Sequence, residues 1–292
     1  MVDIRRSMLF IPGNHPGMLQ NGGVFEADSI ILDLEDAVAP FEKDAARKLV
    51  SMALLHVDYG NSEKVVRINP LDCDGGADIA AVVPNGPDAI LLPKVQSAAE
   101  IRDAARLIAA AEGRGQKPVK IIGLIETPRG LANALEIAEA DPRVVALALG
   151  AEDYTAALGA VRTREGDEIR TARALLINAA GAAGIDVIDT PFTDVNDDAG
   201  LAEDARLAKR LGFKGKLAIN PRQVEVIHDA FNPSAKDIAW AERVVDAIEQ
   251  AKAQGSGVIS VDGKMVDAPI VSRANRTLEL ARMLGITTED VR

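Results

Sequence analysis

The chain has 292 residues, of which 48% are hydrophobic, 26% are charged and only 3% are aromatic. A net charge of −11 and the shortage of aromatic rings argue against a nucleic-acid surface, which needs a basic face and stacking side chains. No apolar run approaches the roughly 20 residues of a membrane span, and the apolar stretch near the N-terminus is too short for a signal peptide. We therefore expect a cytoplasmic protein with neither nucleic acid nor membrane as a partner.

Eight short apolar segments predict buried strands, and each one closes on polar or turn-forming residues. Strands that are apolar throughout are typical of parallel sheets covered by helices on both faces. They are expected at Ser7–Ile11, Ser29–Leu34, Lys64–Ile68, Ala89–Leu92, Val119–Ile125, Val144–Leu149, Asp186–Ile188 and Lys216–Ile219.

Helical patterns, with apolar residues three or four positions apart, alternate with these strands. The clearest are Glu42–Leu55, Ala98–Glu112, Leu131–Ala140, Glu168–Ala183 and Ala199–Leu211. Strands begin roughly every 30 residues, the length of a strand–helix unit with short loops. An open doubly wound sheet would instead need a phosphate-binding GxGxxG motif after its first strand, and the sequence there does not supply one. The pattern therefore predicts a (β/α)8 TIM barrel.

A further amphipathic helix is expected at Lys236–Gln254, where it would complete the barrel. Residues 1–254 would then form a catalytic barrel domain. The helix would end at Gly255–Gly257, because consecutive flexible residues interrupt a helical pattern.

The remaining residues, 255–292, predict a hairpin and a helix, so that the barrel carries a C-terminal helix–hairpin–helix extension. Two short apolar segments flank Asp262–Gly263, which is a strong signal for a two-residue hairpin turn. The last helix is expected at Val271–Leu284. Because a lone hairpin is marginally stable in water, we expect this segment to pack on the barrel or on a neighbouring subunit.

Two acids close consecutive predicted strands: Glu126 directly follows one apolar run, and Asp153 follows the next. The C-terminal ends of barrel strands form the rim on which active sites are built, so both carboxylates are expected there. Two such carboxylates repel each other unless a cation holds them, and Mg²⁺ typically takes one or two protein carboxylates. The sequence therefore predicts a Mg²⁺ site at this pair. Capping of the helices that follow the two strands is the alternative.

Cysteine and histidine are scarce, which bears on the kind of metal and on the compartment. The single cysteine, Cys73, rules out an intramolecular disulfide and suits a reducing cytoplasm. The three histidines are far apart in sequence, which favours oxygen ligands over a zinc site. His228 is expected on a helix in a structural role.

The second and third predicted strands end in charged residues. Asp33 and Glu35 would share one strand face, with Asp36 on the other, to hold metal-bound waters or to fix an arginine. Arg67 would point into the barrel mouth together with Asn69, and its planar fork suits a substrate carboxylate. An ion pair with Asp33 or Glu35 is the alternative, and the two roles are compatible.

Lys94 lies just after the fourth predicted strand, and two roles are open for it. A lysine at the end of a barrel strand can form a Schiff base with a carbonyl substrate. The alternative is an ion pair with the acids of the neighbouring strands. We predict Arg67, Asn69 and Lys94 as substrate-binding residues.

Several segments together resemble the citrate lyase β-subunit family of Mg²⁺-dependent aldolases and lyases. The resemblance extends from about Arg5 to about Arg276, with the matching segments in the same order. They are RRSMLFIPGNHPGML, ADSIILDLEDAV, VVRINPLD, LLPK, LIET, LALGAEDY, GFKGKLAINPRQ and DGKMVDAPIV.

This resemblance implies roles for individual residues. Glu126 and Asp153 match the metal ligands of the family, and Arg67 matches its substrate-contacting arginine. Glu35 and Asp36 match an acidic pair around the metal, so they are predicted as catalytic together with Arg67. Asp267, in the segment GKMVDAP, matches a proton-transferring acid that in related CoA lyases reaches into an adjacent subunit. A homotrimer or hexamer is therefore implied.

The resemblance also implies the reaction, which is cleavage of a citryl thioester to oxaloacetate and an acetyl thioester. The acyl group would be carried by an acyl carrier protein or by CoA, and Thr127–Arg129 is more similar to the CoA-lyase relatives. The α and γ subunits of citrate lyase are candidate partners. The alternatives are a stand-alone malyl- or citramalyl-CoA-type lyase, a Mg²⁺-dependent CoA thioesterase, or a non-catalytic assembly component.

Overall fold

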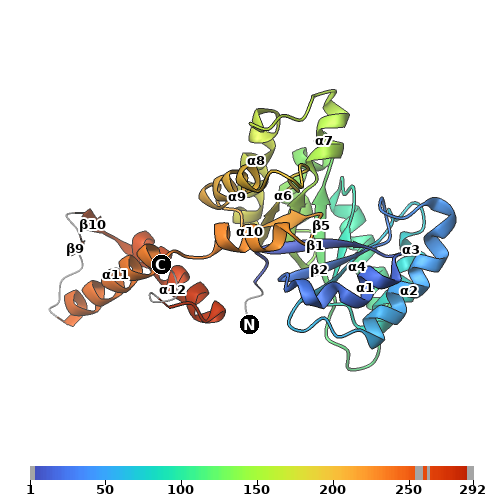
Figure 1. Cartoon of the computed structure of the whole chain (residues 1–292), viewed down its shortest axis with the longest axis horizontal. Coiled ribbons are helices and arrows are strands. Elements are labelled where there is room, and N and C mark those ends of the chain that lie inside the picture. Colours follow the sequence, from blue (N-terminus) through green and yellow to red (C-terminus); the bar gives the residue numbers. More distant parts are fainter. Residues whose placement is uncertain (1–3, 254–258, 262–263, 288–292) are drawn as a thin grey trace. The chain divides into compact units, whose positions relative to one another are not determined.

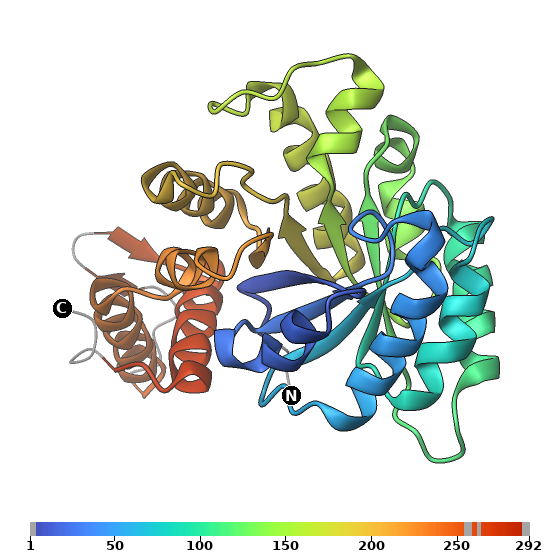
Figure 2. The same ribbon diagram turned by 45° about the vertical axis from the view of Figure 1, so that its right-hand side comes forward.

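A computed structural model of the chain describes residues 4–253, 259–261 and 264–287. Eight parallel strands close into a barrel, in which each strand pairs with its neighbours in sequence and the last returns to the first. Helices surround these strands (Figures 1 and 2). The prediction of a TIM barrel is thus confirmed. The strands are β1 (Ser7–Pro12), β2 (Ser29–Asp33), β3 (Glu63–Arg67), β4 (Ala89–Leu92), β5 (Lys120–Ile125), β6 (Val144–Leu149), β7 (Asp186–Asp189) and β8 (Gly215–Ala218).

Ten α-helices belong to the described part of this barrel unit, in which α2, α3 and α4 lie in sequence order along one side (Figure 2). They are α1 (Pro16–Asn21), α2 (Lys43–His56), α3 (Gly75–Val82), α4 (Ala98–Ala111), α5 (Pro128–Ala132), α6 (Ala134–Ala138), α7 (Ala151–Leu158), α8 (Arg170–Ala183), α9 (Asp198–Leu211) and α10 (Gln223–Phe231). Short 3-10 helices occur at Gly22–Phe25, Pro40–Glu42, Val83–Asn85 and Asp167–Ile169.

The single helix expected at Leu131–Ala140 is two short helices, α5 and α6. Asn133, between them, has φ −103° and ψ 12°, outside the helical region, which ends α5 and starts a new helix. Four further helices, α1, α3, α7 and α10, have only six to nine residues each, too few for a clear periodic pattern. None of the described helices is long and apolar enough to cross a membrane.

The barrel is apolar on both faces of its strands, which explains the unbroken hydrophobic runs in the sequence. One set of side chains fills the interior and the alternate set packs under the helices. The buried interior set is Met8, Ile31, Val65, Ala89, Leu91, Ile122, Leu124, Ala146, Ala148, Ile188 and Leu217. Because successive side chains alternate, the next residue on the Val65 face is Arg67, which therefore points inward at the rim.

The chain divides into two compact units between Phe231 and Asn232, earlier than the boundary expected after residue 254. The helix expected to complete the barrel is α11 (Ala235–Ala253), which belongs to the second unit. There it packs with α12 (Ala268–Leu284), and apolar residues of the two helices share one core. The buried residues of this small core are Ala241, Val244, Val266 and Ala274.

The expected hairpin is present as an antiparallel pair, β9 (Ile259–Val261) and β10 (Lys264–Val266). Its predicted turn residues, Asp262–Gly263, and the predicted helix break at Gly255–Gly257 lie outside the described residues. The last helix begins at Ala268, earlier than expected. Asp267 is its N-cap residue, and the Asp267 side chain accepts a hydrogen bond from the backbone nitrogen of Ile270.

Candidate active site

A cavity of about 420 Å³ opens at the C-terminal ends of the barrel strands. Its lining combines apolar barrel residues with five carboxylates and one arginine that come from β2, β3, β5 and α7 or from the residues just after them. The lining residues used below are Phe10, Asp33, Asp36, Arg67, Glu126, Gly150 and Asp153.

Arg67, the last residue of β3, is paired in register with Asp33, the last residue of β2. The two side chains form a bidentate ion pair with hydrogen bonds of 2.7 and 2.6 Å. The guanidinium also stacks over the ring of Phe10, with 4.8 Å to its centroid. Burial lowers the pKa of Arg67, but the negative charges of Asp33 and the nearby acids raise it by more. The net pKa of Arg67 therefore lies above its ordinary value. Arg67 is therefore a permanent, rigidly held cation in the barrel mouth.

Asp33 also organises the segment that follows β2. Its two carboxylate oxygens accept hydrogen bonds from the backbone nitrogens of Glu35 and Ala37. These bonds bend the chain into a turn, so the strand alternation expected to separate Asp36 from Glu35 ends at Asp33. Glu35 lies 3.0 Å and Asp36 lies 3.3 Å from the same nitrogen of Arg67. The expectation that Asp36 faces the other way is therefore wrong.

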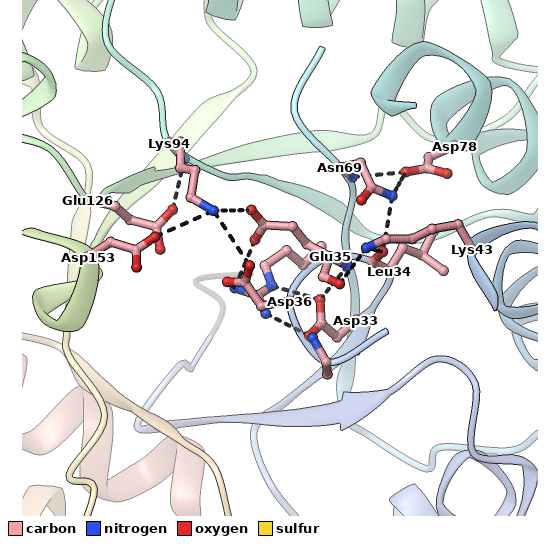
Figure 3. Close-up of polar contacts among 12 residues, drawn as sticks. Asp33, Leu34, Glu35, Asp36, Lys43, Asn69, Asp78, Lys94, Glu126 and Asp153 are labelled. Atoms are coloured by element: carbon pink, nitrogen blue, oxygen red, sulfur yellow. Dashed lines mark hydrogen bonds and ion pairs between the residues drawn. The ribbon is translucent and has the colours of Figure 1, made fainter. Parts of the chain in front are cut away.

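Lys94 ties this acidic segment to the two predicted metal ligands (Figure 3). Its Nζ atom lies 2.7 Å from Glu35, 3.5 Å from Asp36 and 3.4 Å from Asp153. Burial lowers the pKa of Lys94, but Glu35 and Asp36 raise it more, so its amine stays charged. A Schiff base requires a neutral amine, so the geometry favours the ion-pairing alternative over the nucleophilic one.

The backbone of Lys94 contributes as well, since its nitrogen donates a 2.9 Å hydrogen bond to Oε2 of Glu126. At Lys94 the backbone has φ +52°, the left-handed conformation that non-glycine residues seldom adopt. Such a conformation persists where the surrounding structure determines it, and it is often found at functional sites.

Glu126 follows β5 directly and is only 5% exposed. Burial, reinforced by the negative charges of Glu35 and Asp153, raises the pKa of Glu126 to about 8. Gly150, at the end of β6, leaves just enough room for this side chain, because a Cβ atom there would lie 2.4 Å from Cγ of Glu126. The hydrogen bond from Lys94 and the charge of Arg67 lower the pKa of Glu126 but do not offset burial, so its negative charge is only partly compensated.

Asp153 lies in the first turn of α7, beside Glu126 (Figure 3). Helix capping does not account for either acid: Thr127 caps α5 with its own hydroxyl, and Gly150 is the N-cap residue of α7. Within the described ranges, no group of three or more His, Cys, Asp or Glu side chains is arranged to hold a metal. Mg²⁺ needs only one or two carboxylates and completes its shell with water and substrate, so the pair fits this ion.

Comparison with known proteins identifies the family of this site. A model of the family described as HpcH/HpaI aldolase/citrate lyase matches residues 6–221. The chain belongs to the HpcH/HpaI aldolase/citrate lyase family. The citrate lyase subunit beta of Leuconostoc mesenteroides subsp. cremoris is 48% identical over 282 residues, covering 95% of this chain and 93% of that protein. The (3S)-malyl-CoA thioesterase of Cereibacter sphaeroides is 36% identical over 281 residues, covering 96% and 95%.

A solved structure agrees with this membership of the HpcH/HpaI family. The crystal structure of protein CitE from Mycobacterium tuberculosis, in complex with magnesium, acetoacetate and coenzyme A, is 34% identical. It superposes with a TM-score of 0.80, and the match covers 96% of this chain and 98% of that chain.

In this HpcH/HpaI family member, most of the predicted site residues come together in the barrel unit, whereas Asn69 does not line the cavity and Asp267 belongs to the second unit. Asn69 is buried, and its amide nitrogen donates to the backbone oxygen of Leu34 and to Asp78. These bonds favour a structural role, so substrate binding by Asn69 stays a prediction. Asp267 is exposed at the start of α12 in the second unit. His228 has a polar contact of 2.7 Å with Ser7, as a structural residue would.

Three residues around the site were not predicted. Gly150 was visible only as the residue before an acidic pair. Asp78 stands among the buried residues of α3 (Gly75, Ile79 and Val82), and an acid on the apolar face of a helix is the signal that marks it. Lys43 gave no signal, because a lysine at the start of a helix is ordinary on a surface.

Proposed function

We propose that this protein is a Mg²⁺-dependent carbon–carbon lyase that cleaves a citryl thioester to oxaloacetate and an acetyl thioester. The observation that carries the proposal is the pair of carboxylates, Glu126 and Asp153, beside the fixed cation Arg67 in one cavity. The 48% identity to a citrate lyase subunit beta supports it, as does the magnesium in the related structure from M. tuberculosis. Glu126 and Asp153 would hold the ion.

The reaction is the reverse of a Claisen-type addition. The hydroxyl of the citryl group loses its proton, the adjacent carbon–carbon bond breaks, and the oxygen becomes the ketone of oxaloacetate. The bonding electrons move to the acetyl carbon, which becomes a thioester enolate and then takes a proton. Bound Mg²⁺ supplies Lewis-acid polarisation of the substrate hydroxyl and the adjacent carboxylate.

The charged residues of the chain position and stabilise the substrate. Arg67 faces the cavity with its charge fixed by Asp33, so it is placed to bind a substrate carboxylate and to stabilise developing negative charge. Glu35 is the candidate acceptor for the hydroxyl proton. Its Oε2 atom is buried and, among the described residues, has an ion pair but no hydrogen bond. Burial raises the pKa of Glu35, although Arg67 and Lys94 oppose this, so its carboxylate is a stronger base than an exposed one.

Proton delivery to the acetyl carbon is assigned to Asp267 of an adjacent subunit in a homotrimer or hexamer. This assignment rests on the resemblance of the segment around Asp267 to CoA lyases, together with the exposure of its carboxylate. An acyl carrier protein or CoA would carry the acyl group, and α and γ subunits of citrate lyase are the proposed partners for the carrier-bound form.

The test is an assay of oxaloacetate release from citryl-CoA and from a citryl acyl carrier protein, each with Mg²⁺ and with excess chelator. We expect Mg²⁺-dependent oxaloacetate formation from at least one of the two. The relative rates identify the carrier. Parallel measurement of free thiol with malyl-CoA tests the thioesterase alternative, which the 36% identity to such an enzyme supports. Thiol release without oxaloacetate from any citryl thioester would contradict the lyase proposal.

A further inference from the structure

Asp78 is a buried carboxylate on α3 that does not line the described active-site cavity. It is only 1% exposed, and three hydrogen bonds satisfy it. Its Oδ2 atom accepts from the backbone nitrogen of Asn69 at 2.8 Å and from the Asn69 side chain at 2.7 Å. Its Oδ1 atom accepts from Nε of Arg47 at 2.7 Å. A buried charge is costly unless its contacts are complete, so this arrangement is a specific one.

Asn69 links Asp78 to the acidic segment after β2. The same side-chain nitrogen that meets Asp78 also donates to the backbone oxygen of Leu34 at 3.0 Å. The ammonium of Lys43 donates to that oxygen as well, at 2.7 Å, and to the backbone oxygen of Glu35. Figure 3 shows the Asn69 side chain joined to both Asp78 and Leu34, on the opposite side of Glu35 from Glu126.

The segment around Leu34 contacts both cations of the active site, Arg67 and Lys94. Leu34 lies between Asp33 and Glu35, and its backbone nitrogen donates to the backbone oxygen of Arg67 at 2.9 Å. The Glu35 carboxylate lies 2.7 Å from Lys94 and 3.0 Å from Arg67. A shift of the Leu34 carbonyl would therefore move the carboxylate that both cations contact.

The loop between β3 and α3 is shaped so that Asp78 can reach Asn69. The backbone nitrogen of Gly75 donates to the backbone oxygen of Pro70. A Cβ atom at position 75 would lie 2.4 Å from the backbone oxygen of Asn69, so only glycine permits this approach. The first turn of α3 is thereby brought against the end of β3.

We propose that Asp78 is a positioning residue of the active site, which acts through Asn69 to fix the Leu34 carbonyl and thereby the Glu35 carboxylate. The proposal rests on the proposed lyase function for its kinetic consequence, and on the geometry alone for its structural one. It also assigns the Asn69 amide to positioning rather than to substrate contact.

Two substitutions separate positioning from general stability. Asn69→Ala breaks the link to Leu34 but leaves the ion pair of Asp78 with Arg47. Asp78→Asn can keep its oxygen toward Asn69, where it accepts two hydrogen bonds, and then turns its amide toward Arg47, where one bond is lost. The opposite orientation would lose two acceptors and is disfavoured. Asn69→Ala therefore breaks the hydrogen bond between Asn69 and Leu34, on the side of the active site. Asp78→Asn breaks the hydrogen bond between Asp78 and Arg47, on the other side.

Between Asn69→Ala and Asp78→Asn, we expect the variant with the lower melting temperature to have the higher kcat. Asn69→Ala should lower kcat by about tenfold or more, because small misplacements of catalytic groups are costly. Asp78→Asn should keep a higher kcat than Asn69→Ala despite a lower melting temperature. Asp44→Asn removes the negative charge of another, exposed partner of Arg47 and should leave kcat unchanged. If kcat follows melting temperature through the series, the positioning role is refuted.

Crystal structures of the wild type and Asn69→Ala supply a readout that does not depend on the reaction. We expect the Glu35 carboxylate to leave its contact with Lys94 in the variant. If the contact between Glu35 and Lys94 and the kcat are both unchanged in Asn69→Ala, the positioning role of Asp78 and Asn69 is overturned. A wild type without lyase activity would overturn the proposed function instead. The position of Glu35 in the two crystal structures would still decide whether Asp78 and Asn69 fix it.

Discussion

Gly150 and Glu126 are in such close contact that any side chain at position 150 would displace Glu126. A Cβ atom there would lie 2.4 Å from Cγ and 2.6 Å from Oε1 of Glu126. The backbone nitrogen of Gly150 also donates to the backbone oxygen of Ile125, at 2.9 Å. The position of the Glu126 carboxylate therefore depends on a glycine at position 150.

The Gly150→Ala variant should bind Mg²⁺ about 10- to 100-fold more weakly, as is typical when the residues that orient a metal ligand are changed. The added methyl must push Glu126 away from its position beside Asp153. Isothermal calorimetry with Mg²⁺ measures the change. Gly181→Ala, on the exposed part of α8 where a Cβ atom meets nothing within 4 Å, is the matched control. Equal Mg²⁺ affinity in both variants would contradict the role of Gly150.

The raised pKa of Glu126 predicts that Mg²⁺ binding depends on pH. At about 8, this pKa means that the carboxyl is mostly protonated at neutral pH before the ion binds. Binding should therefore release about one proton per Mg²⁺ at pH 7, and affinity should rise until the pH passes about 8. Calorimetry in buffers of different ionisation enthalpy counts the protons. Proton release that persists in Glu126→Gln would assign it to another group.

The same shift has a consequence for stability without Mg²⁺. A carboxyl whose pKa is higher in the folded than in the unfolded protein binds its proton more tightly when folded. Its contribution to stability is complete below its ordinary pKa of 4.5 and is lost as the pH rises through about 8. In chelator, the melting temperature of the wild type should fall over this range relative to Glu126→Gln. Added Mg²⁺ should restore it near pH 8 only in the wild type.

Arg67→Lys tests the rigid fork at the end of β3. Lysine keeps the charge but cannot make both hydrogen bonds to Asp33, which is 1% exposed. We expect kcat to fall by about 100-fold or more, the usual effect of removing one positioned donor to a developing charge. Stability should fall by about 1–3 kcal/mol, because a buried acceptor loses its partner. Arg106→Lys, in an exposed pair with Asp103, is the control and should change neither quantity.

The sequence was sufficient for the barrel because its signals are long and repeated. Eight apolar runs at regular spacing, each ending in polar residues, leave few other topologies, and Glu126 and Asp153 were placed correctly by the ends of those runs. The pattern failed where a contact, rather than a periodicity, decides the outcome. The apolar face of α11 is satisfied by α12 in one unit of the structure, and nothing in its period distinguishes that partner from a barrel.

The site shows the same division. Strand alternation located Arg67 correctly, but it put Asp36 on the wrong side because the Asp33 carboxylate turns the chain directly after β2. Asn69 was expected to contact substrate because it follows Arg67 at an interval of two. In the structure its amide donates to Asp78, a residue from the next helix, which the interval does not indicate. Side-chain contacts of this kind depend on distances between segments, and neither the composition nor the hydrophobic periodicity of the sequence gives these distances.

Asp267→Asn separates proton transfer from helix capping. Asparagine is as good an N-cap residue as aspartate, so the hydrogen bond to Ile270 and the stability of α12 should be kept. If Asp267 delivers the proton to the acetyl carbon, the variant should lose about 100-fold or more in kcat, within the usual range for a positioned general acid. Unchanged turnover at unchanged melting temperature would leave Asp267 with its capping role alone.

Mixed oligomers then show in which subunit Asp267 acts. Asp267→Asn and Glu126→Gln are each expected to be inactive alone. If the acid serves an adjacent active site, subunits exchanged in equal amounts should recover roughly one working site in four, since each such site needs an intact Glu126 from one chain and an intact Asp267 from its neighbour. If the acid serves its own barrel, every chain carries one defect and mixing restores nothing. The assay is oxaloacetate release after the two variants are unfolded together and refolded, with each variant refolded alone as the control.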